Sequence, residues 1–507
     1  MIIKVLINNI LTFPLYCCAR TIVFLNDQKR TFSKRMKAVF ASIFSILFCA
    51  ARLVAQTDSC DIRIFVEGIQ PGKVKLIGAF ADQNYLADST LVDEHGLIQF
   101  KRKSPLKPGY FYVILPDYSN LHFLADADQH FVIRTKRSDL FGAATVEGST
   151  DNEMLYASFK MQLRHEALYD SVSKVISGLD PNDPRYLAGK KIYDQMGAER
   201  KAQLDKDRQR FPNSFYVKFK YSGQNPEVHD VRKTNGDLDT SAQLRMFRNE
   251  FWDNFDFRDE RLLYTPVIAN KIKTYMNDLT MQNPDSLIAQ ADILIDKSLV
   301  NQEMFKFISN WLLIKYQPTK TSVMDGEAVF VHIIDKYMTK ELATWYNDKE
   351  LADIKKKAFE MRASLLNRKG PDVISKDPFG QTKSIYEMKE PYIIVFMYDT
   401  KCEHCQKETP LLRKFIDEWK EKNIGVFAIV LNSTENEWKE FMLQNRMQDW
   451  VNVRDPSNVS IYAKYFVDIT PEIYILNRDR MIIGKNLKVE QIATIINRDQ
   501  QKQANNK

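Results

Sequence analysis

Hydrophobic and polar residues alternate with a period of two from residue 60 to residue 135, and turn residues interrupt the alternation at short intervals. Such alternation is typical of strands that bury one face. Many short strands at close spacing predict a small antiparallel β-sandwich or barrel over residues 56–150. The expected strands cover residues 62–67, 73–80, 89–92, 97–101, 110–115, 121–124 and 130–135.

From residue 151 to residue 368, apolar residues instead recur at steps of three and four, as they do along one face of a helix. Breaks that are polar or contain proline divide this region into roughly eight helices, which predicts an α-helical middle domain. The aromatic cluster from Phe251 to Phe257 suggests a ligand site. Aromatic residues interleaved with Asp and Arg more often belong to a packed core with solvated caps, so we expect packing here.

A third pattern begins at Lys369-Gly370-Pro371 and covers residues 369–507. An apolar strand, a helix and a second apolar strand follow one another, which indicates a βαβ unit within a C-terminal α/β domain. A proline directly before an apolar strand, as at Pro471, is compatible with an edge position or a cis peptide bond. The expected elements cover residues 392–398, 402–422, 424–431, 437–445, 461–466, 469–476, 481–484 and 489–497.

The chain of 507 residues is too long for one hydrophobic core, and about 150 residues per domain suggests roughly three domains. Its net charge of +7 is concentrated at the N-terminus, because residues 1–55 contain eight Lys or Arg and one Asp. The rest of the chain contains 64 basic and 64 acidic residues. The charge distribution therefore does not indicate a nucleic-acid partner.

Residues 1–55 contain the pattern of a secretory signal peptide. The basic run from Lys34 to Lys37 precedes an apolar stretch at 38–51, and small or aliphatic residues follow at 53–55. This stretch is shorter than the ~20 residues that span a bilayer, so we expect cleavage and export to the periplasm or cell envelope. Membrane association is not indicated after cleavage. Met36 is the expected start, with a genuine N-terminal extension as the alternative.

Three cysteines, Cys60, Cys402 and Cys405, remain after the expected cleavage. They are too few for a disulfide framework, and a single CxxC without a nearby His cluster lacks the four ligands of a zinc site. We therefore expect no metal. Cys60 alternates with Ile62 and Ile64, which predicts a buried apolar residue on the inward face of a strand.

Cys402 and Cys405 follow an apolar strand and stand at the start of the next helix. Unpaired backbone N–H groups and the helix dipole stabilise a thiolate at this position. The pair is therefore a candidate redox site, and a structural disulfide is the alternative.

The order strand, CxxC helix, strand, helix, Thr-Pro, hairpin and helix resembles the thioredoxin fold. The segment from Cys402 to Pro410 is similar to the ResA/TlpA type of extracytoplasmic thiol-disulfide oxidoreductase, whose CxxC helix is kinked by a proline that Pro410 matches. Thr470-Pro471 matches the Thr and cis-proline that face the active-site sulfurs in that family. The first two domains resemble the β-rich and helical modules that precede such domains in Bacteroidetes envelope proteins.

The resemblance implies that Cys402 attacks a substrate disulfide as a thiolate and that Cys405 resolves the mixed disulfide. Lys401 and His404 add positive charge near the Cys402 sulfur, which favours the thiolate. Glu403 adds negative charge in the same loop, and on this balance a reductant or weak isomerase is favoured over a strong oxidant.

Glu408 stands where the family keeps a buried glutamate that influences cysteine protonation. The resemblance therefore implies that Glu408 relays the proton of Cys405. The alternative is a solvated helix residue that pairs with Lys407 or Arg413.

Three residues depart from the patterns of related proteins. Lys401 replaces the usual Trp before the first cysteine, which changes the surface beside the thiol and the expected choice of partner. Phe396 replaces the buried Asp of thioredoxin six residues before that cysteine. Asp399 stands where a peroxiredoxin carries Thr, which disfavours a peroxidase.

The sequence thus predicts an exported thiol-disulfide oxidoreductase that needs no cofactor. Its expected partners are cysteine-containing envelope proteins and an unidentified electron donor or acceptor. Two alternatives stay open. One is a disulfide-forming oxidase, and the other is an envelope binding or scaffold protein in which the first two domains act and the CxxC is structural.

Overall fold

The computed structural model describes residues 60–318, 323–454, 464–467 and 469–505. The expected signal peptide and the start at Met36 lie outside these residues, as does half of the apolar segment expected at 461–466. In the described part of the chain, no helix is both long and apolar enough to cross a bilayer.

The described N-terminal strands form two four-stranded sheets with the orders β4-β1-β7-β8 and β3-β2-β5-β6. One cluster of buried side chains, which includes Ile62, Val113 and Phe123, draws on both sheets, so the domain is a sandwich. The strands are β1 (Cys60–Glu67), β2 (Gly72–Phe80), β3 (Gln83–Val92), β4 (Leu97–Arg102), β5 (Gly109–Ile114), β6 (Asn120–Ala125), β7 (His130–Lys136) and β8 (Thr145–Glu147).

One pair in this sandwich departs from the expected antiparallel arrangement. β1 and β7 run parallel, because β7 enters the sheet by a crossover from β6 in the other sheet and not by a hairpin from β1. Cys60 is fully buried on the inward face of β1, as predicted, and burial raises the pKa of its thiol to about 11.

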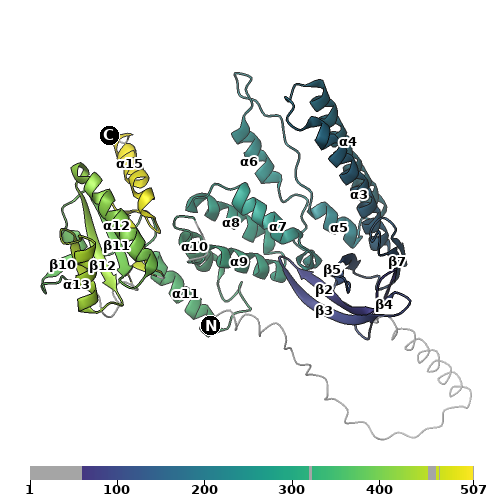
Figure 1. The fold of residues 1–507 in the computed structure, drawn as a ribbon, viewed down its shortest axis with the longest axis horizontal. Helices are drawn as coiled ribbons and strands as arrows, with labels where there is room; N and C mark the ends of the chain where they lie inside the picture. The colour runs from purple at the N-terminus through teal and green to yellow at the C-terminus, as the bar shows by residue number, and fades with distance from the viewer. Residues whose placement is uncertain (1–59, 319–322, 455–463, 468, 506–507) are drawn as a thin grey trace, which may run out of the picture. The chain divides into compact units, whose positions relative to one another are not determined.

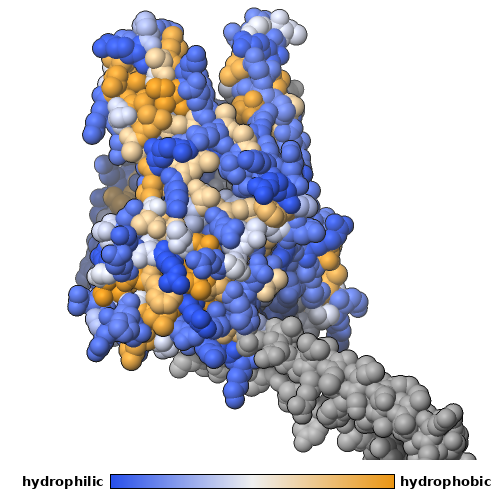
Figure 2. Space-filling model, turned by 90° about the vertical axis from the view of Figure 1, so that its right-hand side faces the viewer, coloured by the Kyte–Doolittle hydropathy of each residue, from blue (hydrophilic) through white to orange (hydrophobic). Residues whose placement is uncertain are grey.

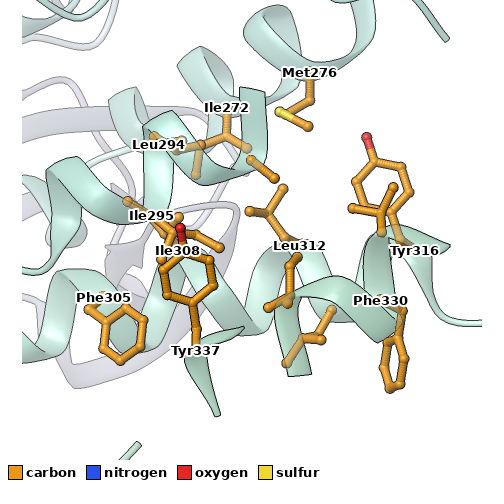
Figure 3. Packing of buried hydrophobic residues seen from close by; sticks show 14 of the residues in the cluster. Ile272, Met276, Leu294, Ile295, Phe305, Ile308, Leu312, Tyr316, Phe330 and Tyr337 are labelled. Carbon is orange, nitrogen blue, oxygen red and sulfur yellow. The ribbon is translucent and has the colours of Figure 1, made fainter. Parts of the chain in front are cut away.

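The middle region is helical, and its described residues form nine α-helices where roughly eight were expected. They are α3 (Thr150–Ile176), α4 (Pro184–Arg210), α5 (Phe215–Ser222), α6 (Thr240–Glu250), α7 (Val267–Lys273), α8 (Pro284–Ser298), α9 (Gln302–Tyr316), α10 (Glu327–Tyr337) and α11 (Asp348–Arg362). Residues spaced three or four apart on α8, α9 and α10 meet in one core, where Leu294, Ile308 and Tyr337 lie close together (Figure 3). The aromatic cluster from Phe251 to Phe257 belongs to this core, so the expected packing is confirmed.

The surface of the helical region also carries large apolar side chains. Figure 2 shows hydrophobic patches on a mainly hydrophilic face. The exposed apolar residues of α3 and α4 are Leu163, Leu168, Tyr169, Val175 and Leu187.

The C-terminal domain is built on a seven-stranded mixed sheet with the order β10-β9-β13-β12-β11-β14-β15. The central strand β11 is parallel to β12 and antiparallel to β14. The strands of this sheet are β9 (Ile374–Lys376), β10 (Thr382–Ser384), β11 (Tyr392–Asp399), β12 (Ile424–Leu431), β13 (Val451–Arg454), β14 (Glu472–Leu476) and β15 (Ile482–Gly484).

One face of this sheet packs against α12 (Glu403–Glu418), α13 (Glu435–Gln444) and α15 (Val489–Asn505), with Leu412, Phe441 and Ile492 in the shared core. Figure 1 shows these helices beside the sheet. The other face packs against Val373, Ile385 and Tyr465. The expected strand–helix–strand order is confirmed. The short strands β9, β10 and β13 were not expected, because three or four residues are too few to show an alternation.

Candidate active site

The segment that leads into the CxxC is held in place by burial and by hydrogen bonds. β11 is fully buried from Tyr392 to Tyr398, and the loop after it is tied to the end of β12. The Thr400 N–H donates to Ser433 Oγ at 3.2 Å, and the two hydroxyl oxygens lie 2.9 Å apart. Gln406 Nε2 in the following helix donates to the Thr400 carbonyl at 3.1 Å. These bonds fix the direction from which α12 leaves the sheet.

Cys402 occupies the N-cap position of α12, where a side chain accepts from the first unpaired N–H groups of the helix. Its Sγ accepts the Cys405 N–H at 3.3 Å. Cys402 is half-buried, whereas Cys405 is fully buried one turn later, and both are free thiols. The N-terminal sulfur is thus the one that a partner can reach.

The two thiols differ in acidity. Burial raises the pKa of the Cys402 thiol, but hydrogen bonds with Cys405 and Thr470 outweigh burial. The His404 backbone N–H acts in the same direction, and the pKa lies below its usual value. Burial, followed by the hydrogen bond with Cys402, raises the pKa of Cys405 to about 12. Cys402 is therefore the more acidic thiol of the pair, and its role as the nucleophile stays a prediction.

The Thr470–Pro471 loop lies against Cys402. The peptide bond between the two residues is cis, and the Cys402 thiol donates to the Thr470 carbonyl at 3.2 Å. The structure therefore brings together two cysteines and a Thr-Pro pair that are far apart in the sequence.

The three residues expected to tune the thiolate occupy different surroundings. Lys401 is exposed, and its Nζ lies 2.8 Å from Glu437 Oε1 on α13, so its charge is largely compensated. The side chains of Glu403 and His404 are exposed on the first turn of α12. The pairing of Lys401 with Glu437 was not anticipated, because Lys401 lies in the loop before α12 and Glu437 lies on α13.

Glu408 is half-buried and turned toward α15. Its Oε2 accepts the Val489 N–H at 3.3 Å, at the first residue of that helix. The alternative partner Arg413 instead binds Asp417 and Asp449, each at 2.6 Å. Glu408 thus helps to hold α15 against the CxxC helix, and its role in proton transfer stays a prediction.

Glu472, a buried carboxyl group directly after Pro471, was not expected from the sequence analysis. Burial raises its pKa to about 8, and the Asn486 N–H donates to its Oε1 at 2.9 Å. A charged residue within an otherwise apolar strand pattern was the only available signal. Within the described residues, no group of three or more His, Cys, Asp or Glu side chains is arranged to hold a metal ion.

Two known protein families match adjacent segments of the chain. Residues 366–492 match the AhpC/TSA family. This segment is a thioredoxin-fold domain of that family. The helical residues 238–364 immediately before the AhpC/TSA domain match DUF5106, a domain of unknown function.

The AhpC/TSA domain also has curated relatives. Thiol-disulfide oxidoreductase ResA of Bacillus cereus strain ZK is 22% identical over 120 residues, which are 24% of this chain and 68% of that protein. ResA of Bacillus anthracis is 22% identical over 127 residues, with 24% and 72% coverage. The expected relationship to ResA-like thiol-disulfide oxidoreductases is confirmed.

Solved structures similar to this chain include a thioredoxin-like protein from Bacteroides caccae. It has 17% sequence identity and a TM-score of 0.45, with 54% of this chain and 97% of that chain covered. The thioredoxin domain of a thiol-disulfide oxidoreductase from Bacteroides vulgatus has 21% identity and a TM-score of 0.25, with 26% and 96% covered.

Proposed function

We propose that this protein is an extracytoplasmic thiol-disulfide oxidoreductase that reduces disulfides in cysteine-containing envelope proteins. The observation that carries the proposal is the difference between its two thiols. Cys402 is half-buried at a helix N-terminus with a lowered pKa, and Cys405 is buried behind it with its pKa raised to about 12. One accessible thiolate backed by one protonated thiol is the arrangement that sequential disulfide exchange needs.

The reaction follows from this arrangement. The Cys402 thiolate attacks one sulfur of a substrate disulfide, forms a mixed disulfide, and releases the other substrate sulfur as a thiolate that takes up a proton. Cys405 then loses its proton and attacks Cys402 Sγ, which forms the Cys402–Cys405 disulfide and releases the second substrate thiol. The substrate gains two electrons and two protons. A dithiol reductant must return the same number to the CxxC.

The charges around Cys402 support the reducing direction. A strong oxidant requires a strongly stabilised thiolate. Here the nearest lysine, Lys401, is paired with Glu437 at 2.8 Å, and Glu403 adds a further negative charge to the first turn. An equilibrium potential against glutathione tests this direction, and a value near that of the strongest oxidants, about −120 mV, would reverse it. Export rests on the signal pattern of residues 34–55, and cell fractionation tests it.

Trapping tests the exchange reaction in cells. In the Cys405→Ser variant the mixed disulfide cannot be resolved, so we expect envelope proteins to accumulate on Cys402 and to be released by dithiothreitol. The Cys402→Ser/Cys405→Ser double variant is the matched control. If the single variant traps no more protein than the double variant, the proposed exchange does not occur.

A further inference from the structure

The loop that carries Thr470 and Pro471 is held by the helical region at its N-terminal side. Phe466 is 8% exposed and belongs to the helical core, together with Phe330 and Met361. The carbonyl of the preceding Tyr465 accepts the Ser364 hydroxyl at 3.0 Å. The chain therefore enters the loop from an anchor in the helical region.

The C-terminal side of the loop has a second anchor, which begins at Glu472. Alternate residues of β14 face opposite sides of the sheet, and Ile473 packs in the cluster that contains Cys405. Glu472 and Tyr474 are two residues apart on β14, so their side chains lie on the same face of the sheet. Tyr474 packs on the face opposite to α12, and Glu472 therefore points away from α12. Its hydrogen-bond partner Asn486 also donates from Nδ2 to Glu327 Oε1 of α10, at 2.8 Å.

Buried charges surround this second anchor. Lys485 Nζ lies 3.3 Å from Asp325 Oδ1 and 3.6 Å from Glu327 Oε2, and all three side chains are buried. Lys485 also lies over the Tyr474 ring, 5.6 Å from its centre. Asp325 and Glu327 come from the helical region, and Lys485 comes from the C-terminal domain. Removing one member of such a cluster leaves a buried charge without compensation, so we expect loss of Lys485 to disturb the contact between the two parts.

Thr470, the acceptor for the Cys402 thiol, lies between these two anchors. We propose that the helical region is a working part of the redox site, because it holds Thr470 against Cys402 through Phe466 on one side and the Lys485–Asp325–Glu327 cluster on the other. Phe466 and Lys485 are then positioning residues that set the reactivity of the Cys402 sulfur. This inference deepens the proposed function, but the reactivity of Cys402 can be measured without any protein partner.

The test is the pH dependence of Cys402 alkylation by iodoacetamide in the full chain, followed by mass spectrometry of the Cys402 peptide. The Thr470 carbonyl accepts the Cys402 thiol, whereas the Thr470 side chain contributes a hydrogen bond that lowers the pKa of Cys402. A loop that no longer holds this side chain near the sulfur therefore raises that pKa. In Phe466→Ala and Lys485→Met we expect the midpoint to move to higher pH and the rate at pH 7 to fall about three- to tenfold.

Two control variants carry the same substitutions away from the loop. Phe305→Ala removes a ring that packs on Trp345 in the same helical core, and Lys488→Met removes an exposed lysine. Both should keep the wild-type midpoint. If Lys485→Met does not fold, Phe466→Leu provides a milder change, with a smaller shift in the same direction.

Two results would overturn the positioning role. One is a wild-type midpoint in folded anchor variants, and the other is an equal shift in Phe305→Ala. A full chain that shows the anchor-dependent midpoint but fails to reduce a protein disulfide would refute the proposed function and support the positioning role.

Discussion

Glu472 offers a test of the buried charge cluster through the pH dependence of stability. The residue is 8% exposed, and burial raises the pKa of its carboxyl group from 4.5 to about 8. The folded protein therefore holds this proton at pH values where the unfolded chain has lost it. The contribution of Glu472 to the free energy of unfolding is therefore fully present below pH 4.5, and it is lost as the pH rises toward 8. Glu472→Gln removes the titrating group.

The size of the effect follows from the pKa difference. Each pKa unit corresponds to about 1.4 kcal/mol, so Glu472 can cost the wild-type protein up to about 4 kcal/mol between pH 5 and pH 8. The Gln variant is free of this loss, because its amide is neutral at every pH. We therefore expect the free energy of unfolding of Glu472→Gln, relative to wild type, to increase as the pH rises.

Urea unfolding at pH 5, 6.5 and 8, followed by tryptophan fluorescence, measures this difference. Trp419, Trp438 and Trp450 report on the C-terminal domain. Glu421→Gln, at an exposed position, is the control and should keep a constant difference from wild type. If the difference between Glu472→Gln and wild type is the same at pH 5 and pH 8, Glu472 is not held protonated by burial, and the reasoning is refuted.

Three further predictions concern the site. Iodoacetamide at pH 7 should modify Cys402 but neither Cys405, whose pKa is about 12, nor the buried Cys60, and peptide mass spectrometry that finds modified Cys405 in the folded chain would contradict this assignment. Glu408→Gln should slow resolution of the mixed disulfide about tenfold or more in single-turnover assays without changing its formation, and an unchanged resolution rate would remove Glu408 as the proton relay. Lys401→Ala should leave the melting temperature unchanged, because an exposed ion pair contributes little, and a clear drop in a thermal scan would show that the contact with Glu437 is structural.

Local sequence patterns were enough to predict the elements that carry the chemistry. The apolar run of β11 and the position of Cys402 at a helix start depend on residues close together in the chain, and both are found as expected. The pairing of β1 with β7 could not be predicted, since it depends on how the chain crosses between two sheets.

The partners of charged and polar residues could not be predicted from the sequence either. Lys401, in the loop before α12, pairs with Glu437 on α13, and Asn486 pairs with Glu327 across 159 positions of sequence. No local pattern predicts such contacts, because polar and charged residues of these types are most often exposed, and the sequence around them does not show which ones have a distant partner. The buried cluster behind Glu472 therefore became visible only in the folded chain.

The most direct test of thiol-disulfide exchange is reduction of insulin by the purified chain with dithiothreitol as electron donor, followed by the turbidity of the precipitating B chain. We expect wild type to shorten the lag before precipitation, and Cys402→Ser, which lacks the nucleophile, to behave as the reaction without protein. Equal lag times for wild type, Cys402→Ser and the blank would contradict the assignment of Cys402 and Cys405 as a redox pair.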